Sequence, residues 1–413
     1  MMEAVIVSAV RTPVGRYMGG LRDVLAYDLA ALVLNAALER AGMEPDRVDD
    51  VILGQSYQNG ENVNIARMAL LKAGWPEAIP GITFDRRCCT GLDTVCFAAS
   101  LIRSEQARVV VAGGVESMSN AEFYLPGHIK WGIGGRKGMP RGHGDLGIWG
   151  MPFYDRIQRA RVMSQPEERY GILPSMMSWA ETGAREENIS REACDLWSFH
   201  SHKKACAAME KGVFAQEIVP VPVPQRKGGP IIMDRDENPR ADTTLEKLAS
   251  LKPVLGGVCT AGNSSTENDG AAAVVVMSRD MADQLSLEPL AVLRASAVAG
   301  DDPRRAYKTV PTAVGKALER AGLTMDRMDL IEIQEAFAAQ VLADLKEMGV
   351  GEEDYGKINV NGSGISLGHP IACTGTRVLV TLLHEMQRRN ARYGLECICG
   401  GGGLGIAAIL ERP

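Results

Sequence analysis

A repeated segment is the feature that most limits how this chain can fold. Residues 37–42, Ala-Leu-Glu-Arg-Ala-Gly, reappear unchanged at residues 317–322. The loop after each copy also matches, as Asp46, Arg47 and Asp49 in the first and Asp326, Arg327 and Asp329 in the second. An aligned helix, glycine stop, loop and apolar strand is hard to attribute to chance. We therefore expect two copies of one α/β unit in a chain of 413 residues, which is too long for one ordinary core.

Strand-like and helix-like patterns alternate in each copy. The first copy has expected strands near 4–8, 50–54, 82–85 and 108–113, and helices near 27–41, 62–73 and 91–103. The second has expected strands near 291–298, 329–333, 394–399 and 405–410, and helices near 311–321, 335–348 and 371–390. This alternation predicts mostly parallel strands with helices on both faces. The apolar run 271–276 predicts a late buried strand that returns to the first sheet.

The pattern changes between about residues 120 and 250. Glycine, proline and methionine crowd 126–152, and helix-like stretches follow at 175–188 and 190–211. We interpret this region as a long insertion folded over one end of the sheets, because insertions of this size often cover substrates. The predicted domains are 1–275, which contains the insertion, and 276–413.

Composition excludes several classes of protein. A formal charge of −6, with 46% hydrophobic and 23% charged residues, fits a soluble globular protein without a general nucleic-acid-binding face. No apolar run approaches the roughly 18 residues that cross a bilayer. No basic leader or peroxisomal signal is seen, so we expect a cytoplasmic protein without nucleic-acid or membrane partners. Nine scattered cysteines without a C-x2-C pair indicate neither a disulfide framework nor a metal site.

Cys88 lies between a strand-like and a helix-like run. This places its thiol at a helix N-terminus, where the helix dipole and free N–H groups favour a thiolate and can bind an oxyanion. The adjacent Cys89 is a competing nucleophile, and the turn alone does not choose between the two thiols.

Two further motifs lie near the C-terminus. His369 stands in Gly368-His369-Pro370, where proline at a helix start holds an imidazole that can act as a base to a thiol. Cys399 ends a strand and precedes four consecutive glycines, which allow close backbone approach to a ligand. One cysteine can hold an acyl group while the other moves a proton on carbon. The set therefore predicts acyl transfer with two thiols.

These motifs, in this order, resemble the thiolases, the acetyl-CoA acyltransferases, over essentially the whole chain. Further matching segments are residues 7–15, 112–119, 260–265 and 268–272. The resemblance implies an α/β thiolase fold: two similar βαβαβαββ halves stacked as a five-layer α-β-α-β-α sandwich, with a loop-domain insertion in the first half. It also implies reversible, CoA-dependent cleavage of 3-oxoacyl-CoA, or Claisen condensation of acetyl-CoA, in fatty acid metabolism such as beta-oxidation.

The resemblance assigns roles to individual residues. Cys88 would be the acyl-accepting nucleophile, His369 its activator and Cys399 the acid/base at the acetyl-CoA methyl group. The N–H groups of Cys88 and Gly401 would form an oxyanion hole, and Gln334 stands where the family usually has the Asn or His that holds an oxyanion-hole water. The implied coenzyme A contacts are Ser265, Ala261, Met176, Arg240 and Phe337. Coenzyme A is a substrate, no cofactor is permanently bound, and a homodimer or homotetramer is implied.

Two alternatives remain at this stage. A decarboxylating 3-oxoacyl synthase-type condensing enzyme would share the fold, but such enzymes have Cys-His-His or Cys-His-Asn sites, and a thiol at Cys399 argues against them. A non-catalytic, thiolase-like acyl-CoA or lipid binder is the second alternative, which the unusual Gln334 favours.

Overall fold

The computed structural model describes residues 2–125 and 153–413, so residues 126–152 of the predicted insertion lie outside the described residues. The strands of the main sheet are β1 (Ala4–Arg11), β2 (Gly15–Arg16), β3 (Asp50–Gly54), β4 (Gly81–Phe84), β5 (Val109–Ser117), β10 (Asn268–Ser278), β11 (Ala291–Gly300), β12 (Leu330–Ile333), β13 (Tyr393–Gly400) and β14 (Leu404–Glu411). Two short pairs are β6 (Phe123–Tyr124) with β7 (Tyr154–Asp155), and β8 (Val221–Val223) with β9 (Ile231–Met233).

The helices surround and separate these strands. Those of the two repeated units are α1 (Ala26–Ala41), α2 (Ile65–Lys72), α3 (Thr90–Arg103), α9 (Arg279–Gln284), α10 (Thr309–Ala321), α11 (Ala338–Glu347), α12 (Gly364–Leu367) and α13 (Ile371–Arg389). Those of the insertion are α4 (Arg156–Val162), α5 (Glu167–Tyr170), α6 (Met177–Glu186), α7 (Arg191–Glu210) and α8 (Leu245–Ala249). Short 3-10 turns are η1 (Pro45–Arg47), η2 (Met118–Asn120), η4 (Val213–Gln216), η5 (Pro303–Lys308), η6 (Met325–Arg327) and η7 (Glu352–Lys357).

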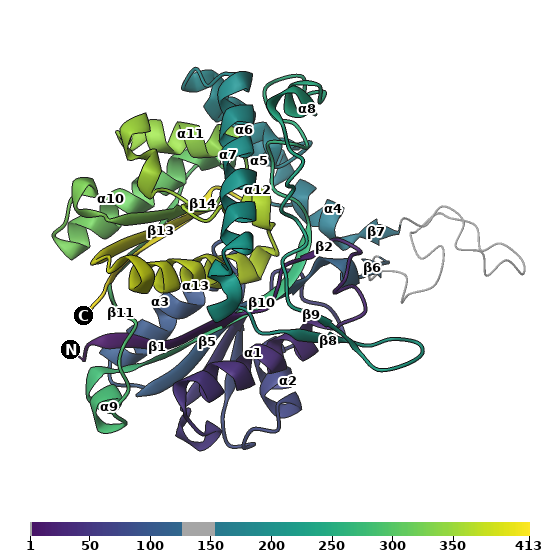
Figure 1. The fold of residues 1–413 in the computed structure, drawn as a ribbon. Helices are drawn as coiled ribbons and strands as arrows, with labels where there is room; N and C mark the ends of the chain where they lie inside the picture. Colours follow the sequence, from purple (N-terminus) through teal and green to yellow (C-terminus); the bar gives the residue numbers. More distant parts are fainter. Residues whose placement is uncertain (1, 126–152) are drawn as a thin grey trace, which may run out of the picture.

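Five layers are visible in Figure 1. From top to bottom, α10 and α11 cover β13 and β14, α3 and α13 form the middle layer, and β1, β5 and β10 lie above α1 and α2. The strand order is β12-β13-β14-β11-β1-β10-β5-β3-β4, and a short antiparallel pairing of β1 with β11 joins the two halves. The predicted five-layer sandwich is confirmed. Helices α3 and α13 are buried on most sides, as a central layer requires.

The expected strand pairing was partly wrong. Every strand and helix predicted for the two copies is present, and β10 returns to the first sheet between β1 and β5 as expected. However, within the described part of the main sheet, parallel pairing is confined to β3 with β4 and β5, and to β12 with β13. A tight turn makes β14 antiparallel to β13. The insertion leaves β5 and returns into β10 at the same end of the sheet, so these two strands are antiparallel as well.

The two copies agree at the level of single hydrogen bonds. Helices α1 and α10 each end at a left-handed glycine, Gly42 with φ of 64° and Gly322 with φ of 66°, a conformation that favours glycine. The Asp49 carboxylate accepts two N–H groups at the start of β5, at 2.7 and 2.9 Å. Asp329 accepts the corresponding pair at the start of β13, both at 2.8 Å. The repeat seen in the sequence is therefore a repeat of structure.

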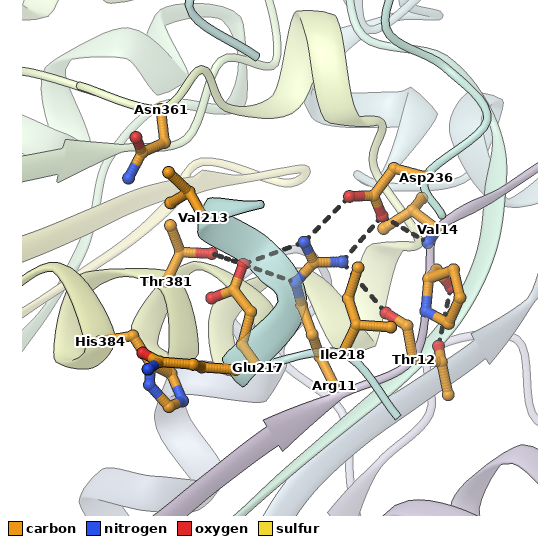
Figure 2. A network of polar contacts seen from close by, with 12 residues as sticks. Arg11, Thr12, Val14, Val213, Glu217, Ile218, Asp236, Asn361, Thr381 and His384 are labelled. Carbon is orange, nitrogen blue, oxygen red and sulfur yellow. Dashed lines mark hydrogen bonds and ion pairs between the residues drawn. The ribbon is translucent and has the colours of Figure 1, made fainter. Parts of the chain in front are cut away.

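A buried charge network attaches the insertion to both halves (Figure 2). The Arg11 guanidinium donates to Glu217 at 3.0 and 3.2 Å and to Asp236 at 2.7 and 2.9 Å, and all three side chains are fully buried. Asp236 also accepts the Val14 N–H at 2.8 Å. The Thr381 hydroxyl, on α13, donates to Glu217 at 3.3 Å. One arginine thus connects β1, the insertion and the central helix layer.

Replacing Arg11 with methionine should lower the free energy of unfolding by about 3–5 kcal/mol, because two buried carboxylates lose their counter-charge. Urea denaturation followed by circular dichroism measures this. The matched control is Arg279→Met, which breaks the partly exposed ion pair with Glu3 at 2.9 Å and should cost at most about 1 kcal/mol. Equal losses in the two variants would contradict a structural role for the buried network.

Candidate active site

One cavity of about 520 Å³ brings the three predicted motifs together. Cys88 reaches it from the loop between β4 and α3, His369 from the loop before α13, and Cys399 and Gly401 from the end of β13 and the glycine turn. The predicted coenzyme A contacts also line this cavity: Met176, Arg240, Ala261, Ser265 and Phe337. The candidate nucleophile therefore comes from the first half of the chain, and its candidate base from the second.

The Cys88 thiol faces a histidine whose tautomer follows from its hydrogen bonds. Nε2 of His369 lies 3.1 Å from Sγ of Cys88, and its Nδ1 lies 2.7 Å from Oγ1 of Thr374. The Thr374 hydroxyl donates its proton to the Pro370 carbonyl at 3.0 Å, so its oxygen accepts from Nδ1–H. Nε2 is then the unprotonated nitrogen and faces the thiol. This is the arrangement that a general base for cysteine requires.

The loop before α13 holds the His369 ring in place. Its backbone N–H donates to Oδ1 of Asn268 at 2.8 Å. Gly368 has φ of 99°, and a Cβ built there would lie 2.2 Å from Nδ2 of Asn238 and 2.6 Å from Oδ1 of Asn268. No residue with a side chain fits without displacing these two amides. The glycine before the histidine is thus required by both backbone conformation and space.

The cysteine and the histidine are both neutral in this structure. Burial lowers the pKa of His369 to about 3, helped by nearby Arg377. Burial also raises the pKa of the Cys88 thiol to about 11, against the effects of the Gly401 N–H and the Arg87 charge. The expected thiolate is therefore not favoured, because α3 begins two residues beyond Cys88 and its dipole is outweighed by desolvation. The proton must move to His369 as the sulfur attacks.

The other two thiols differ in access. Cys399 lines the cavity, and burial raises its pKa well above the usual range, so it is a protonated thiol. Cys89 is fully buried, with its sulfur 3.6 Å from the Ile398 carbonyl, and it is not among the described residues that line the cavity. The structure therefore separates the two adjacent cysteines: Cys88 faces the cavity and Cys89 belongs to the core.

Gln334, expected beside the oxyanion-hole water, stays a prediction as a catalytic residue. It is fully buried just after β12, and the lining of the cavity, within the described residues, does not include it. Its amide packs against Gly364, where an added Cβ would lie 2.5 Å from Nε2. Neither side-chain amide atom has a hydrogen-bond partner in the described part of the chain. The Gln334 amide therefore lies in the packed interior beside Gly364 and not on the described lining of the cavity.

Several residues of the site were missed from the sequence. Glu116 is fully buried and accepts the N–H groups of Ser56, Tyr57 and Ala372, each at 3.1 Å, which joins the loop after β3 to the start of α13 beside the cavity. Thr374 could have been found, since it lies one helical turn beyond Pro370. Other unexpected lining residues are Arg16, Tyr17, Tyr57, Arg87, Met118, Arg161, Trp179 and Glu267. Within residues 2–125 and 153–413, no three His, Cys, Asp or Glu side chains converge as metal ligands.

Thr374→Val should slow alkylation of Cys88 by iodoacetamide roughly 10- to 100-fold, because His369 loses the acceptor that fixes its tautomer. Valine keeps the shape of threonine, and Thr374→Ser, which keeps the hydroxyl, should react at nearly the normal rate. Peptide mapping confirms that the label is on Cys88. An unchanged rate in the valine variant would exclude the threonine from positioning the imidazole.

Family models, related sequences and a solved structure all match this chain to the same family of proteins. Family models described as "Thiolase, N-terminal domain" and "Thiolase, C-terminal domain" match residues 4–280 and 287–412. An acetyl-CoA acetyltransferase of Chromobacterium violaceum is 44% identical, and a beta-ketoadipyl-CoA thiolase of Acinetobacter baylyi is 42% identical, each with 100% of both chains covered. The crystal structure of the Bacillus anthracis acetyl-CoA acetyltransferase superposes with a TM-score of 0.91 at 39% identity, covering 100% of this chain and 99% of that one. Within the described residues, no helix has the length and apolar character needed to span a membrane.

Proposed function

Because the chain belongs to the thiolase family, we propose that its acyltransferase chemistry runs through Cys88, with His369 as base and Cys399 as the acid/base on carbon. The reaction is the reversible, CoA-dependent cleavage of 3-oxoacyl-CoA. The observation that carries these roles is the 3.1 Å contact between Sγ of Cys88 and the unprotonated Nε2 of His369. The protonated thiol of Cys399 on the same cavity wall supports a division of labour between the two cysteines.

Cleavage proceeds in two stages. The Cys88 sulfur attacks the 3-oxo carbon while His369 takes its proton, and the bond between C2 and C3 then breaks. Its electron pair forms the enolate of acetyl-CoA, and Cys399 supplies the proton that converts C2 into a methyl group. In the second stage the sulfur of free coenzyme A attacks acyl-Cys88 and gives its proton to the Cys399 thiolate. The departing Cys88 sulfur recovers its proton from His369, which closes a ping-pong cycle.

Two charges develop during this cycle. The acyl oxygen becomes negative when acyl-Cys88 forms or is attacked, and the N–H groups of Cys88 and Gly401 are proposed to bind it. Both groups already act on the Cys88 sulfur. The enolate oxygen is proposed to lie near the protonated His369, which carries the positive charge at that moment. Gln334, which packs away from the wall, is proposed to act only through the shape of the Gly364 loop.

Coenzyme A is proposed to enter along the part of the cavity that is formed mainly by the insertion and by the loop before β10, here called the coenzyme A wall. That wall includes Ser265, whose N–H donates to Ala336 at 2.9 Å, and the Trp179 and Phe337 rings with centroids 5.3 Å apart. Arg240 lies on this wall and also lines a neighbouring cavity of about 150 Å³. A guanidinium there suits the phosphates of the nucleotide. The remaining expected contacts on this wall are Ala261 and Met176.

Acyl-enzyme trapping tests the proposal. The protein is mixed with acetoacetyl-CoA without free coenzyme A, and intact mass followed by peptide mapping should find one acetyl group, on Cys88. Addition of coenzyme A should discharge it as acetyl-CoA. Substrate cleavage with an adduct on another residue would overturn the role of Cys88. Carbon dioxide release from malonyl-CoA would instead indicate a decarboxylating condensing enzyme.

Other features rest on the family resemblance alone. A homodimer or homotetramer is proposed, and light scattering at several concentrations tests it. The domain division at 275 and 276, a cytoplasmic location and a role in beta-oxidation stay predictions. The family does not decide the acyl group, because the relatives named above carry names that point to different acyl chains.

A further inference from the structure

One wall of the main cavity carries an excess of positive charge. Four arginines line the cavity: Arg240, assigned above to coenzyme A, and the three that we call the positive wall, which are Arg16 at the end of β2, Arg87 immediately before Cys88, and Arg161 on α4. Among the described residues, Glu267 is the one carboxylate that lines the same cavity, and it is ion-paired with Arg161. Among the residues that the structure describes, the guanidinium charges of Arg16 and Arg87 therefore have no carboxylate partner on this wall.

The nearest carboxylates are occupied by other groups. Asp85 accepts the Ser56 hydroxyl at 3.0 Å and the backbone N–H of Arg87 at 2.8 Å. Glu237 accepts the backbone N–H of Arg16 at 2.8 Å and that of a neighbouring glycine. The ion pairs nearby join Arg86 to Asp93 and Arg161 to Glu267, and within residues 2–125 and 153–413 none includes the guanidinium of Arg16 or Arg87. Both can still bind an anion that enters the cavity.

These arginines lie beside the reacting thiol. Arg87 is adjacent to Cys88 in the chain, and consecutive Cα atoms are only about 3.8 Å apart. Burial and Glu116 raise the pKa of Tyr57, whereas Arg161 and Arg87 lower it, so both guanidinium groups lie close to this lining residue. Arg161 also acts on the His369 imidazole. Arg87 and Arg161 of the positive wall thus lie close to Cys88 and His369, where the acyl group is held.

The phosphates of coenzyme A cannot be the ligand of this wall. The whole pantetheine arm separates them from the thioester sulfur, which must reach Cys88, and Arg240, which also lines the neighbouring cavity, is the cation proposed for them. The group that extends from the thioester along the positive wall is the acyl chain. A methyl-ended chain would desolvate charges without pairing them, which is costly. A carboxylate matches the guanidinium fork.

From this placement, and resting on the proposed thiolase function, we propose that the preferred substrate is a short 3-oxoacyl-CoA whose acyl chain ends in a carboxylate, bound by Arg87 with Arg16 and Arg161 around it. Thiolysis of such a substrate gives acetyl-CoA and the CoA thioester of a dicarboxylic acid. The specificity is set by charge at the far end of the chain, not by chain length alone.

The test compares two substrates of equal chain length, 3-oxoadipyl-CoA, which ends in a carboxylate, and 3-oxohexanoyl-CoA, which ends in a methyl group. The wild-type protein should favour the first in kcat/KM by roughly 10- to 100-fold, the range for a hydrogen bond to a charged group. Arg87→Met should lower kcat/KM for 3-oxoadipyl-CoA much more than for 3-oxohexanoyl-CoA and so remove most of this preference. Arg87→Lys should keep part of it. Arg240→Met, on the coenzyme A wall, should lower kcat/KM equally for the two substrates.

The outcomes separate the two proposals. Cleavage of 3-oxohexanoyl-CoA without a preference for 3-oxoadipyl-CoA, or a preference unchanged in Arg87→Met, overturns the charged-chain inference and leaves the thiolase function intact. No cleavage of either substrate or of acetoacetyl-CoA, with no acyl-Cys88, overturns both. If Arg87→Met does not fold, the ratio of the kcat/KM values for the two substrates is measured in Arg16→Met, where the substituted side chain is exposed. A ratio unchanged in that variant overturns the inference as well.

Discussion

Cys88→Ala is expected to abolish the acyl-enzyme and to reduce thiolysis of acetoacetyl-CoA by roughly 10⁴- to 10⁶-fold, the scale seen when a catalytic nucleophile is removed. The reason is geometric: Cys88 is the thiol that meets the unprotonated Nε2 of His369. Intact mass spectrometry after mixing with acetoacetyl-CoA should show no adduct. Steady-state kinetics should show the loss in kcat and not in KM, because the residues proposed to bind coenzyme A are unchanged in this variant.

The neighbouring thiol is the matched control. Cys89 is fully buried and its sulfur contacts the Ile398 carbonyl, so Cys89→Ala should cost some stability and leave acylation of Cys88 intact. An acyl adduct in Cys88→Ala, or loss of acylation in Cys89→Ala alone, would show that Cys89 and not Cys88 is the nucleophile.

Cys399→Ser is expected to separate the two half-reactions. Acyl exchange between acetyl-CoA and labelled coenzyme A moves protons only between sulfur and nitrogen atoms, for which Cys399 is one acceptor among others, so it should persist at a reduced rate. Cleavage of acetoacetyl-CoA needs a proton on carbon and should fall roughly 10²- to 10⁴-fold, the usual contribution of a general acid or base. Serine keeps the shape of the side chain but is a far weaker acid than a thiol.

Cys397→Ala controls for loss of a buried thiol on the same strand. Cys397 is fully buried two residues earlier on β13, and the described lining of the cavity does not include it. Both half-reactions should continue in that variant. If Cys399→Ser lost acyl exchange and cleavage in equal measure, its role would be in the assembly of the site and not in proton transfer.

Much of the fold could be predicted because its signals are local. The glycines that end α1 and α10, and the aspartates that cap the starts of β5 and β13, are read directly from the repeat. Strand direction could not be predicted in this way. It depends on where the chain re-enters the sheet after a long insertion, and no local pattern records that.

The candidate site shows the same division. Cys88, His369 and Cys399 stand in motifs, so the sequence indicated them before the cavity was seen. Arg87 and Gln334 could not be assigned, because their roles depend on which way a side chain points. The Gln334 amide packs against Gly364 in the interior, whereas Arg87 lines the cavity, and no local sequence pattern distinguishes the two outcomes.

The site lies on the seam between the two repeated units. One unit carries the proposed nucleophile, the other the proposed base and the carbon acid, and each alone is chemically incomplete. A hydrogen bond of 3.1 Å across that seam weakens steeply with any increase in distance. Turnover therefore depends on the docking of the two units more sharply than helix or strand content does. The two units share one scaffold, and the proposed chemistry depends on the different side chains that each unit places at the seam.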